Sequence, residues 1–243
     1  MFASLLPTSL HALYAGFDAP LADLDCGQKC SPYNGGIPFC CDIHHAVPTA
    51  YPGEWVHLRA KTDLWQVWRP KNKTHRAELQ ADAGDLILLE CLMLNAGNPA
   101  EPMPEPYCRR DLRTIVCRAF PFFPYFDSKG DLLGLSVYWE YADRCWIISN
   151  LQVVRHEFRE QFIHTYENIF AQMPPEREAF QYHSEETRRV AQERRRTIPL
   201  LHRDGHTYKI SPATEKMHRL APDCFPKHGP YKIADLLAFP EEK

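Results

Sequence analysis

The residues of this chain best suited to chemistry are its cysteines, of which there are nine in 243 residues. Four of them fall within sixteen residues and are followed at once by an aspartate and two histidines: Cys26, Cys30, Cys40, Cys41, Asp42, His44 and His45. A thiolate is a soft, strongly donating ligand, and four thiolates around one centre suit tetrahedral zinc or an iron-sulfur cluster. The spacing therefore predicts metal ligation by the four cysteines, with the histidines as further ligands, as neighbours of the site, or as ordinary surface residues.

Cys40 and Cys41 are adjacent, and adjacent side chains project in different directions, so one metal would strain the pair. The two can serve two centres, or one can support the site without binding the metal. A disulfide pair is the alternative to metal binding, and it needs an oxidising compartment. Residues 1–17 lack both a basic region and a small-residue cleavage site, so we expect reduced thiols in a cytoplasmic protein.

A second, looser set of cysteines follows at Cys91, Cys108, Cys117 and Cys145. Eight cysteines in two groups allow two four-thiolate sites, or one cluster with ligands from both groups and structural roles for the rest. Taken singly, each cysteine of the second set is as compatible with a buried apolar position as with a ligand. Cys224 stands apart in a proline-rich tail and is left out of the candidate ligands.

The order of these motifs is itself informative. The double cysteine Cys40-Cys41 is followed by Cys91, Cys108, the run Cys117-Arg118-x-Phe120-Pro121 and Cys145. This order resembles the YkgJ-type cysteine-cluster family of zinc- or iron-chelating proteins, which includes the flagellin lysine N-methylase. The resemblance covers roughly residues 24–146 and implies a bound metal or iron-sulfur cluster. The family pattern is nearer CxxCxxCC, whereas here nine residues separate Cys30 from Cys40.

Three functions fit these features. The first is a cysteine-ligated iron-sulfur cluster, of the 4Fe-4S type, in electron transfer, redox work or sensing. The second is a protein lysine N-methyltransferase-like enzyme, although the chain has neither a glycine-rich methyl-donor loop nor the CxxxCxxC signature of radical enzymes. The third is a structural zinc protein that acts as an interaction module. Eight thiols exceed what one structural zinc needs, so iron-sulfur is preferred over zinc.

Composition and motifs argue against several classes of protein. The formal charge is -3, the hydrophobic content is 44%, and no apolar run reaches the ~20 residues of a spanning helix, so we expect neither a nucleic-acid nor a membrane protein. No GxGxxG, GxxxxGK[ST], HExxH or GxSxG motif is present. The basic run that ends at Arg196 is expected to be a solvated face, or a contact for an acidic partner or a phosphate. Arg118 is expected to hold a hydrogen bond, to neutralise thiolate charge, or to form a salt bridge.

The elements that must position these residues predict an α+β fold, with an irregular cysteine-rich core, β-hairpins and a long packing helix. The first cysteine group is expected in a loop rich in Gly and Pro. Apolar periodicity and turn signals predict helices at 54–68, 150–173 and 176–196, a strand in preference to a short helix at 86–94, and hairpins at 112–126/132–141 and 198–202/206–210. We expect a cysteine-cluster metal-binding domain at 1–173, with the helix, hairpin and tail of 174–243 packed on it.

Overall fold

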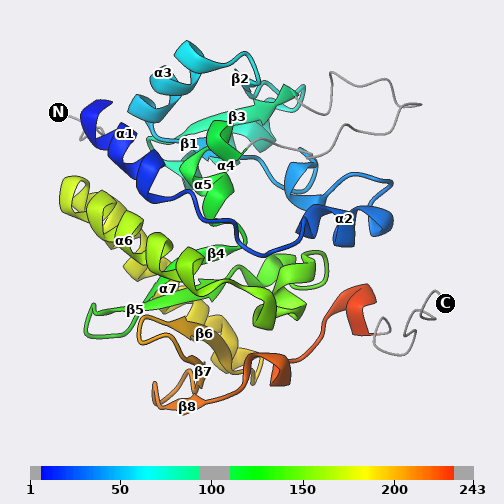
Figure 1. Cartoon of the computed structure of the whole chain (residues 1–243), viewed down its shortest axis with the longest axis vertical. Helices are drawn as coiled ribbons and strands as arrows, with labels where there is room; N and C mark the ends of the chain where they lie inside the picture. Colours follow the sequence, from blue (N-terminus) through cyan, green and yellow to red (C-terminus); the bar gives the residue numbers. More distant parts are fainter. Residues whose placement is uncertain (1–6, 93–109, 233–243) are drawn as a thin grey trace. The chain divides into compact units, whose positions relative to one another are not determined.

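A computed structural model describes residues 7–92 and 110–232 of the protein (Figure 1). It is α+β, as expected, with two antiparallel sheets and helices. The chain divides into two compact units, each made of three segments. Unit 1 comprises Met1–Pro20, Cys40–Phe120 and Glu160–Ala179, and unit 2 comprises Leu21–Phe39, Pro121–Arg159 and Phe180–Lys243. Within the described ranges, no helix has the length and apolar character needed to cross a membrane.

Unit 1 contains a small three-stranded sheet in the order β1-β3-β2. Its strands are β1 (Thr49–Ala50), β2 (Trp65–Val67) and β3 (Ile87–Cys91). Its helices are α1 (Pro7–Gly16), α3 (Pro52–Lys61), α4 (Lys73–Ala83) and α5 (Ile115–Ala119). α1 packs against α3, and α5 packs against β1. The strand predicted at 86–94 is confirmed as β3, and Cys91 is its last residue, paired with Trp65.

Local capping explains two places in unit 1 where the predicted elements are wrong. The predicted helix 54–68 ends early, because Thr62 is extended and the chain then enters β2. The first arm of the predicted hairpin at 112–121 is not a strand. It forms a short 3-10 turn and then α5, because the Thr114 side chain accepts a hydrogen bond from the Cys117 amide and caps a helix there.

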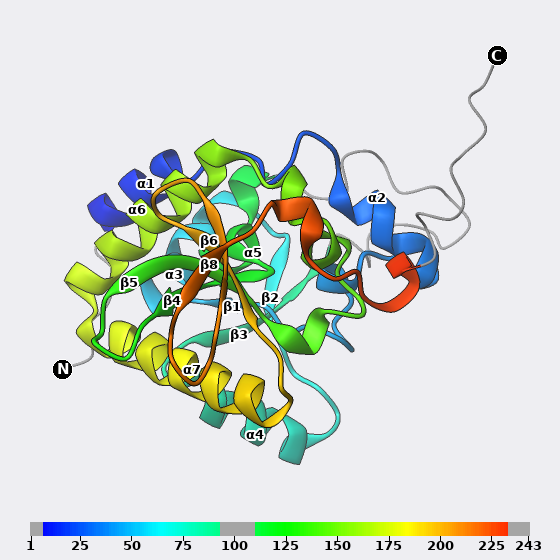
Figure 2. The same ribbon diagram turned by 90° about the horizontal axis from the view of Figure 1, so that it is seen from below.

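Unit 2 is built on a five-stranded antiparallel sheet whose strands follow chain order, as Figures 1 and 2 show. The strands are β4 (Phe122–Phe126), β5 (Leu132–Val137), β6 (Ile198–His202), β7 (Thr207–Ile210) and β8 (Met217–Arg219). The hairpins predicted around 127–131 and 203–205 are confirmed by the pairings of β4 with β5 and of β6 with β7.

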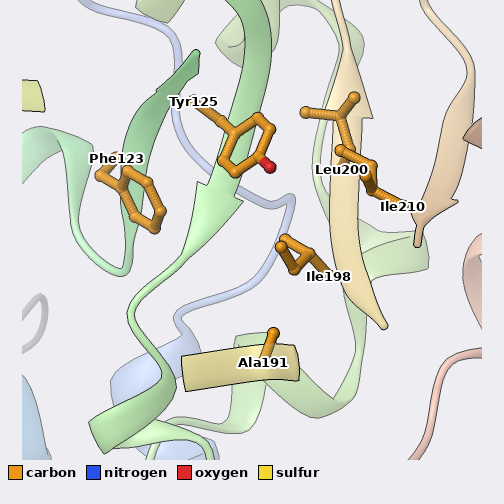
Figure 3. Close-up of a cluster of buried hydrophobic side chains, with 6 residues drawn as sticks. All are labelled: Phe123, Tyr125, Ala191, Ile198, Leu200 and Ile210. Atoms are coloured by element: carbon orange, nitrogen blue, oxygen red, sulfur yellow. The ribbon is translucent and has the colours of Figure 1, made fainter. Parts of the chain in front are cut away.

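A cluster of buried apolar side chains fills one face of this sheet (Figure 3). The cluster consists of Phe123, Tyr125, Ala191, Ile198, Leu200 and Ile210. Ala191 comes from α7 (Pro174–Glu193), and the Ser184 hydroxyl of the same helix accepts a hydrogen bond from the Phe126 amide on the sheet edge. The helix therefore covers the edge strand β4 and supplies part of the core.

α6 (His156–Gln172) corresponds to the helix predicted at 150–173, and its predicted apolar stripe is confirmed as buried: Phe158, Phe162, Tyr166, Ile169 and Phe170. It begins six residues later than predicted, because the preceding chain forms the 3-10 turns η6 (Trp146–Ser149) and η7 (Leu151–Val153). Pro174 ends the region as expected, and it also starts α7, where a proline suits the first helical turn.

Candidate thiolate metal centre

The eight predicted ligands are divided between the two units. Unit 2 carries Cys26, Cys30 and Cys145; unit 1 carries Cys40, Cys41, Cys91 and Cys117; and Cys108 lies outside the described residues. The eight described cysteines of the chain, Cys224 included, are present as thiols rather than disulfides. Metal ligation requires cysteines that are not paired in disulfides.

Cys26 and Cys30 lie on one turn of helix, α2 (Cys26–Cys30), where the sequence predicted a loop. Asp25 caps this turn, because its Oδ1 accepts a hydrogen bond from the Gly27 amide at 2.9 Å. Gly27 is tightly packed, since a Cβ there would lie 3.0 Å from Pro38 Cγ. Residues four apart share a helix face, so the two thiols lie on the same side of α2, with Cys30 buried.

The third thiol of unit 2, Cys145, comes immediately before η6, and α2 packs against η6. A single phenol connects the two cysteine-bearing segments. Tyr231 donates its hydroxyl hydrogen to the Arg144 carbonyl at 2.7 Å, next to Cys145, and its ring meets Tyr33 edge-on at 5.6 Å. Burial, followed by the nearby charges of Cys30 and Cys145, raises the pKa of the Tyr231 phenol, so both thiols act on the same group.

In unit 1, the Sγ atoms of Cys40 and Cys41 lie 3.9 Å apart in the 3-10 turn η2 (Phe39–Cys41). Two thiolates on one tetrahedral zinc, with Zn–S bonds near 2.3 Å, have their sulfur atoms about 3.8 Å apart. The expectation that these neighbours point apart is therefore wrong for this pair, whose sulfur atoms have the separation of two ligands on one metal. Asp42 caps the next turn, because its Oδ1 accepts a hydrogen bond from the His44 amide.

Asp42 also faces His45, whose Nε2 lies 3.7 Å from Asp42 Oδ2. The Asp42 carboxylate thus contacts both histidines of the segment, the His44 amide through its cap and the His45 ring through its other oxygen. The side chain of His44 takes part in none of these contacts; only its backbone amide does.

Cys117 is held by a buried polar framework that sequence reasoning missed. Its helix α5 begins at Ile115, whose amide donates to Glu54 Oε1 at 2.6 Å. Glu54 has no exposed surface and also accepts from the Tyr14 hydroxyl at 2.7 Å and from the Tyr51 amide at 3.1 Å. Burial raises the pKa of Glu54 to about 7 in spite of these donors. One carboxylate thus ties α1, α3 and α5 together.

Arg118, next to Cys117, completes this framework. Its guanidinium is 2% exposed and donates to three backbone carbonyls, those of Tyr14 at 2.9 Å, Phe17 at 2.6 Å and Asp111 at 3.2 Å. It also lies 4.2 Å from the centroid of the Tyr14 ring. Of the roles expected for Arg118, hydrogen bonding is the one observed: it caps the end of α1, which presents unpaired carbonyls.

The donor chemistry of the cysteines fits zinc or iron, since thiolates are the preferred ligands of both in such sites. Geometrically, the ranges 7–92 and 110–232 contain no group of three or more Cys, His, Asp or Glu side chains arranged to hold a metal ion. The described thiols thus provide close sets, not a complete coordination shell. Comparisons with family models, with curated proteins and with solved structures find no match to this chain.

Proposed function

We propose that this protein binds a metal centre through its clustered cysteines, an iron-sulfur cluster in preference to zinc, and that it serves electron transfer or redox sensing. The observation that carries the proposal is the Cys40–Cys41 pair, whose Sγ atoms lie 3.9 Å apart. This is the separation of about 3.8 Å expected for two thiolates that share one tetrahedral metal.

The number of thiols supports the iron-sulfur alternative. A structural zinc is saturated by four ligands, whereas the two predicted sets together hold eight cysteines. When bound, a cluster of this kind supplies reversible one-electron transfer, at a potential that depends on burial and on hydrogen bonds to its sulfur atoms. The chain offers contrasting environments for such tuning, because Cys30 is buried and Cys40 is exposed.

The protein matrix around Cys117 is suited to holding a ligand in place. Glu54 fixes the start of α5, and Arg118 fixes its other end to the carbonyls of α1. A thiolate between two such anchors keeps its position whether or not a metal is bound. This reduces the rearrangement that accompanies a change of charge at a redox centre.

The test compares metal content in three single variants, Cys40→Ser, Cys41→Ser and Cys224→Ser, all purified without oxygen. Cys224 is exposed and lies outside both sets, so its serine variant is the matched control. We expect Cys40→Ser and Cys41→Ser each to lower bound iron and sulfide, while Cys224→Ser keeps the wild-type content. Unchanged content in both of the first two variants would overturn the assignment, and zinc in place of iron would support a structural zinc site instead.

A further inference from the structure

The last described part of unit 2, residues 222–232, is called the C-terminal strap here; it is coloured orange to red in Figure 1. It contains the 3-10 turns η8 (Pro222–Cys224) and η9 (Gly229–Lys232), and η8 packs against η7. Between the two turns, the Lys227 ammonium donates to Asn150 Oδ1 at 2.7 Å. The His228 amide donates to the Ser149 hydroxyl at 2.8 Å. The strap is therefore fixed along its length to the chain that follows Cys145.

Backbone contact at Gly229 brings the strap closest to that chain. Gly229 has φ +52°, and a Cβ at this position would lie 2.2 Å from the Asp143 carbonyl oxygen and 2.8 Å from its carbon. No side chain fits in that space, and the obstacle is backbone, which cannot turn aside. Glycine is therefore the residue that allows the strap to touch the segment two residues before Cys145.

Tyr231 then closes the arrangement. Its side chain is 2% exposed, and it joins the carbonyl of Arg144, beside Cys145, to the ring of Tyr33, three residues after Cys30. In Figure 2 the red end of the strap lies beside the blue segment that carries α2. The two thiol-bearing segments of unit 2, which already pack against each other, are thus also bridged by an aromatic side chain from the C-terminal part of the chain.

We propose that the C-terminal strap is a cover over Cys30 and Cys145, and that Tyr231 is the positioning residue that limits the exposure of the buried Cys30 and the half-buried Cys145. The inference deepens the proposed function and rests on it for its consequence, which is that the strap limits the access of water and oxidants to a centre bound by these cysteines. Burial at a thiolate site controls both its reactivity and its potential.

The experiment measures how fast each cysteine of the full-length, metal-free protein is alkylated by N-ethylmaleimide, with the modified peptides quantified by mass spectrometry. Gly229→Ala forces the strap off Asp143, and the matched control is Gly16→Ala, where an added Cβ meets nothing within 4 Å. Tyr231→Phe removes only the hydroxyl. We expect Gly229→Ala to accelerate alkylation of Cys30 and Cys145 about tenfold, and Tyr231→Phe about fivefold, the effect of one lost buried hydrogen bond.

Cys40 and Cys41, in unit 1, should react at the wild-type rate in every variant. If Gly229→Ala accelerates the alkylation of all cysteines equally, the variant has lost its fold. The Tyr231→Phe variant then tests the proposal. Unchanged rates at Cys30 and Cys145 in Tyr231→Phe would then overturn the proposal.

The same Tyr231→Phe variant, purified with its metal, provides a readout that a purely structural role would not move. If a cluster is bound, we expect its midpoint potential to rise, because water stabilises the more highly charged reduced state. A potential equal to that of the wild type would overturn the positioning role of Tyr231. If the protein as purified contains no metal, the proposed function is refuted. Accelerated alkylation of Cys30 and Cys145 in the variants would still support the cover.

Discussion

Replacing the buried carboxylate of Glu54 by an amide should change how the stability of unit 1 depends on pH. Glu54 has no exposed surface, and it accepts hydrogen bonds from the Tyr14 hydroxyl and from the amides of Tyr51 and Ile115. Glu54→Gln keeps the shape of the side chain and abolishes its titration. The new amide group faces one of those donors with a donor of its own, which should lower the free energy of unfolding by about 1–2 kcal/mol at every pH.

The pH-dependent part follows from the pKa. Burial, opposed by the three hydrogen bonds, raises the pKa of Glu54 from its ordinary 4.5 to about 7 in the folded protein. Since the folded-state pKa is the higher one, the stabilising contribution is complete below pH 4.5 and is lost as the pH rises through 7. The difference corresponds to about 3 kcal/mol, of which about 2.5 kcal/mol is lost between pH 5 and pH 8.

Urea denaturation of the wild type and the variant at pH 5 and pH 8 measures this contribution directly. All other titrating groups are common to both proteins, so they cancel in the comparison. We expect the loss of unfolding free energy between the two pH values to be about 2.5 kcal/mol smaller in Glu54→Gln than in the wild type. The control Glu178→Gln, at an exposed position of α7, should behave as the wild type. The same pH dependence in wild type and Glu54→Gln would refute the reasoning.

Three further substitutions, each followed by urea denaturation, test the packing of the two units. Arg118→Ala removes the donor to three carbonyls, two of them on the buried residues Tyr14 and Phe17, and should cost about 3 kcal/mol; Arg118→Lys should recover less than half of this, because the planar fork is lost. Gly134→Ala places a Cβ 2.2 Å from the Leu201 carbonyl oxygen across β5 and β6, and should cost about 3 kcal/mol or prevent folding, whereas Gly16→Ala should cost nothing measurable. Phe123→Ala leaves a cavity in the core of unit 2 and should lower the free energy of unfolding by about 3–5 kcal/mol. Wild-type stability in any of the three principal variants would contradict the contacts described for that residue.

Elements whose signals are local were predicted well from the sequence. The turn residues Asp127 to Asp131 and Asp204-Gly205 mark the two hairpins, because their backbone conformations suit tight reversals between strands. The apolar stripe of α6 follows helical periodicity and is buried as expected. In each case the information lies within about twenty residues of the element itself, so no tertiary context is needed.

Elements that depend on distant partners were not predictable. The segment 112–121 is rich in β-branched and aromatic residues and was predicted as a strand, yet the Thr114 cap and the Glu54 carboxylate make it the helix that carries Cys117. Glu54 and Arg118 are charged, which in a sequence indicates surface. Both contact Tyr14 on α1, and Arg118 is 104 residues from Tyr14. Such pairings follow from the fold alone.

For the candidate site, the sequence predicted which residues would be ligands but not their spatial grouping. The thiols of Cys26 and Cys30 share a helix face, and those of Cys40 and Cys41 lie side by side, although the spacing indicated a loop and a divergent pair. The covering role of Tyr231 had no signal in the sequence, because the phenol reaches Arg144 from 87 residues away. Ligation of a metal by these cysteines stays a prediction.

The most direct test of the central claim is an elemental analysis of the wild-type protein, purified without oxygen, for iron, zinc and acid-labile sulfide, together with its visible spectrum. The account predicts iron and sulfide in matching amounts and a broad visible absorption that bleaches on reduction. Stoichiometric zinc and a colourless solution would contradict the redox role and support a structural zinc site. A folded protein that contains neither metal would contradict the claim that these cysteines are ligands.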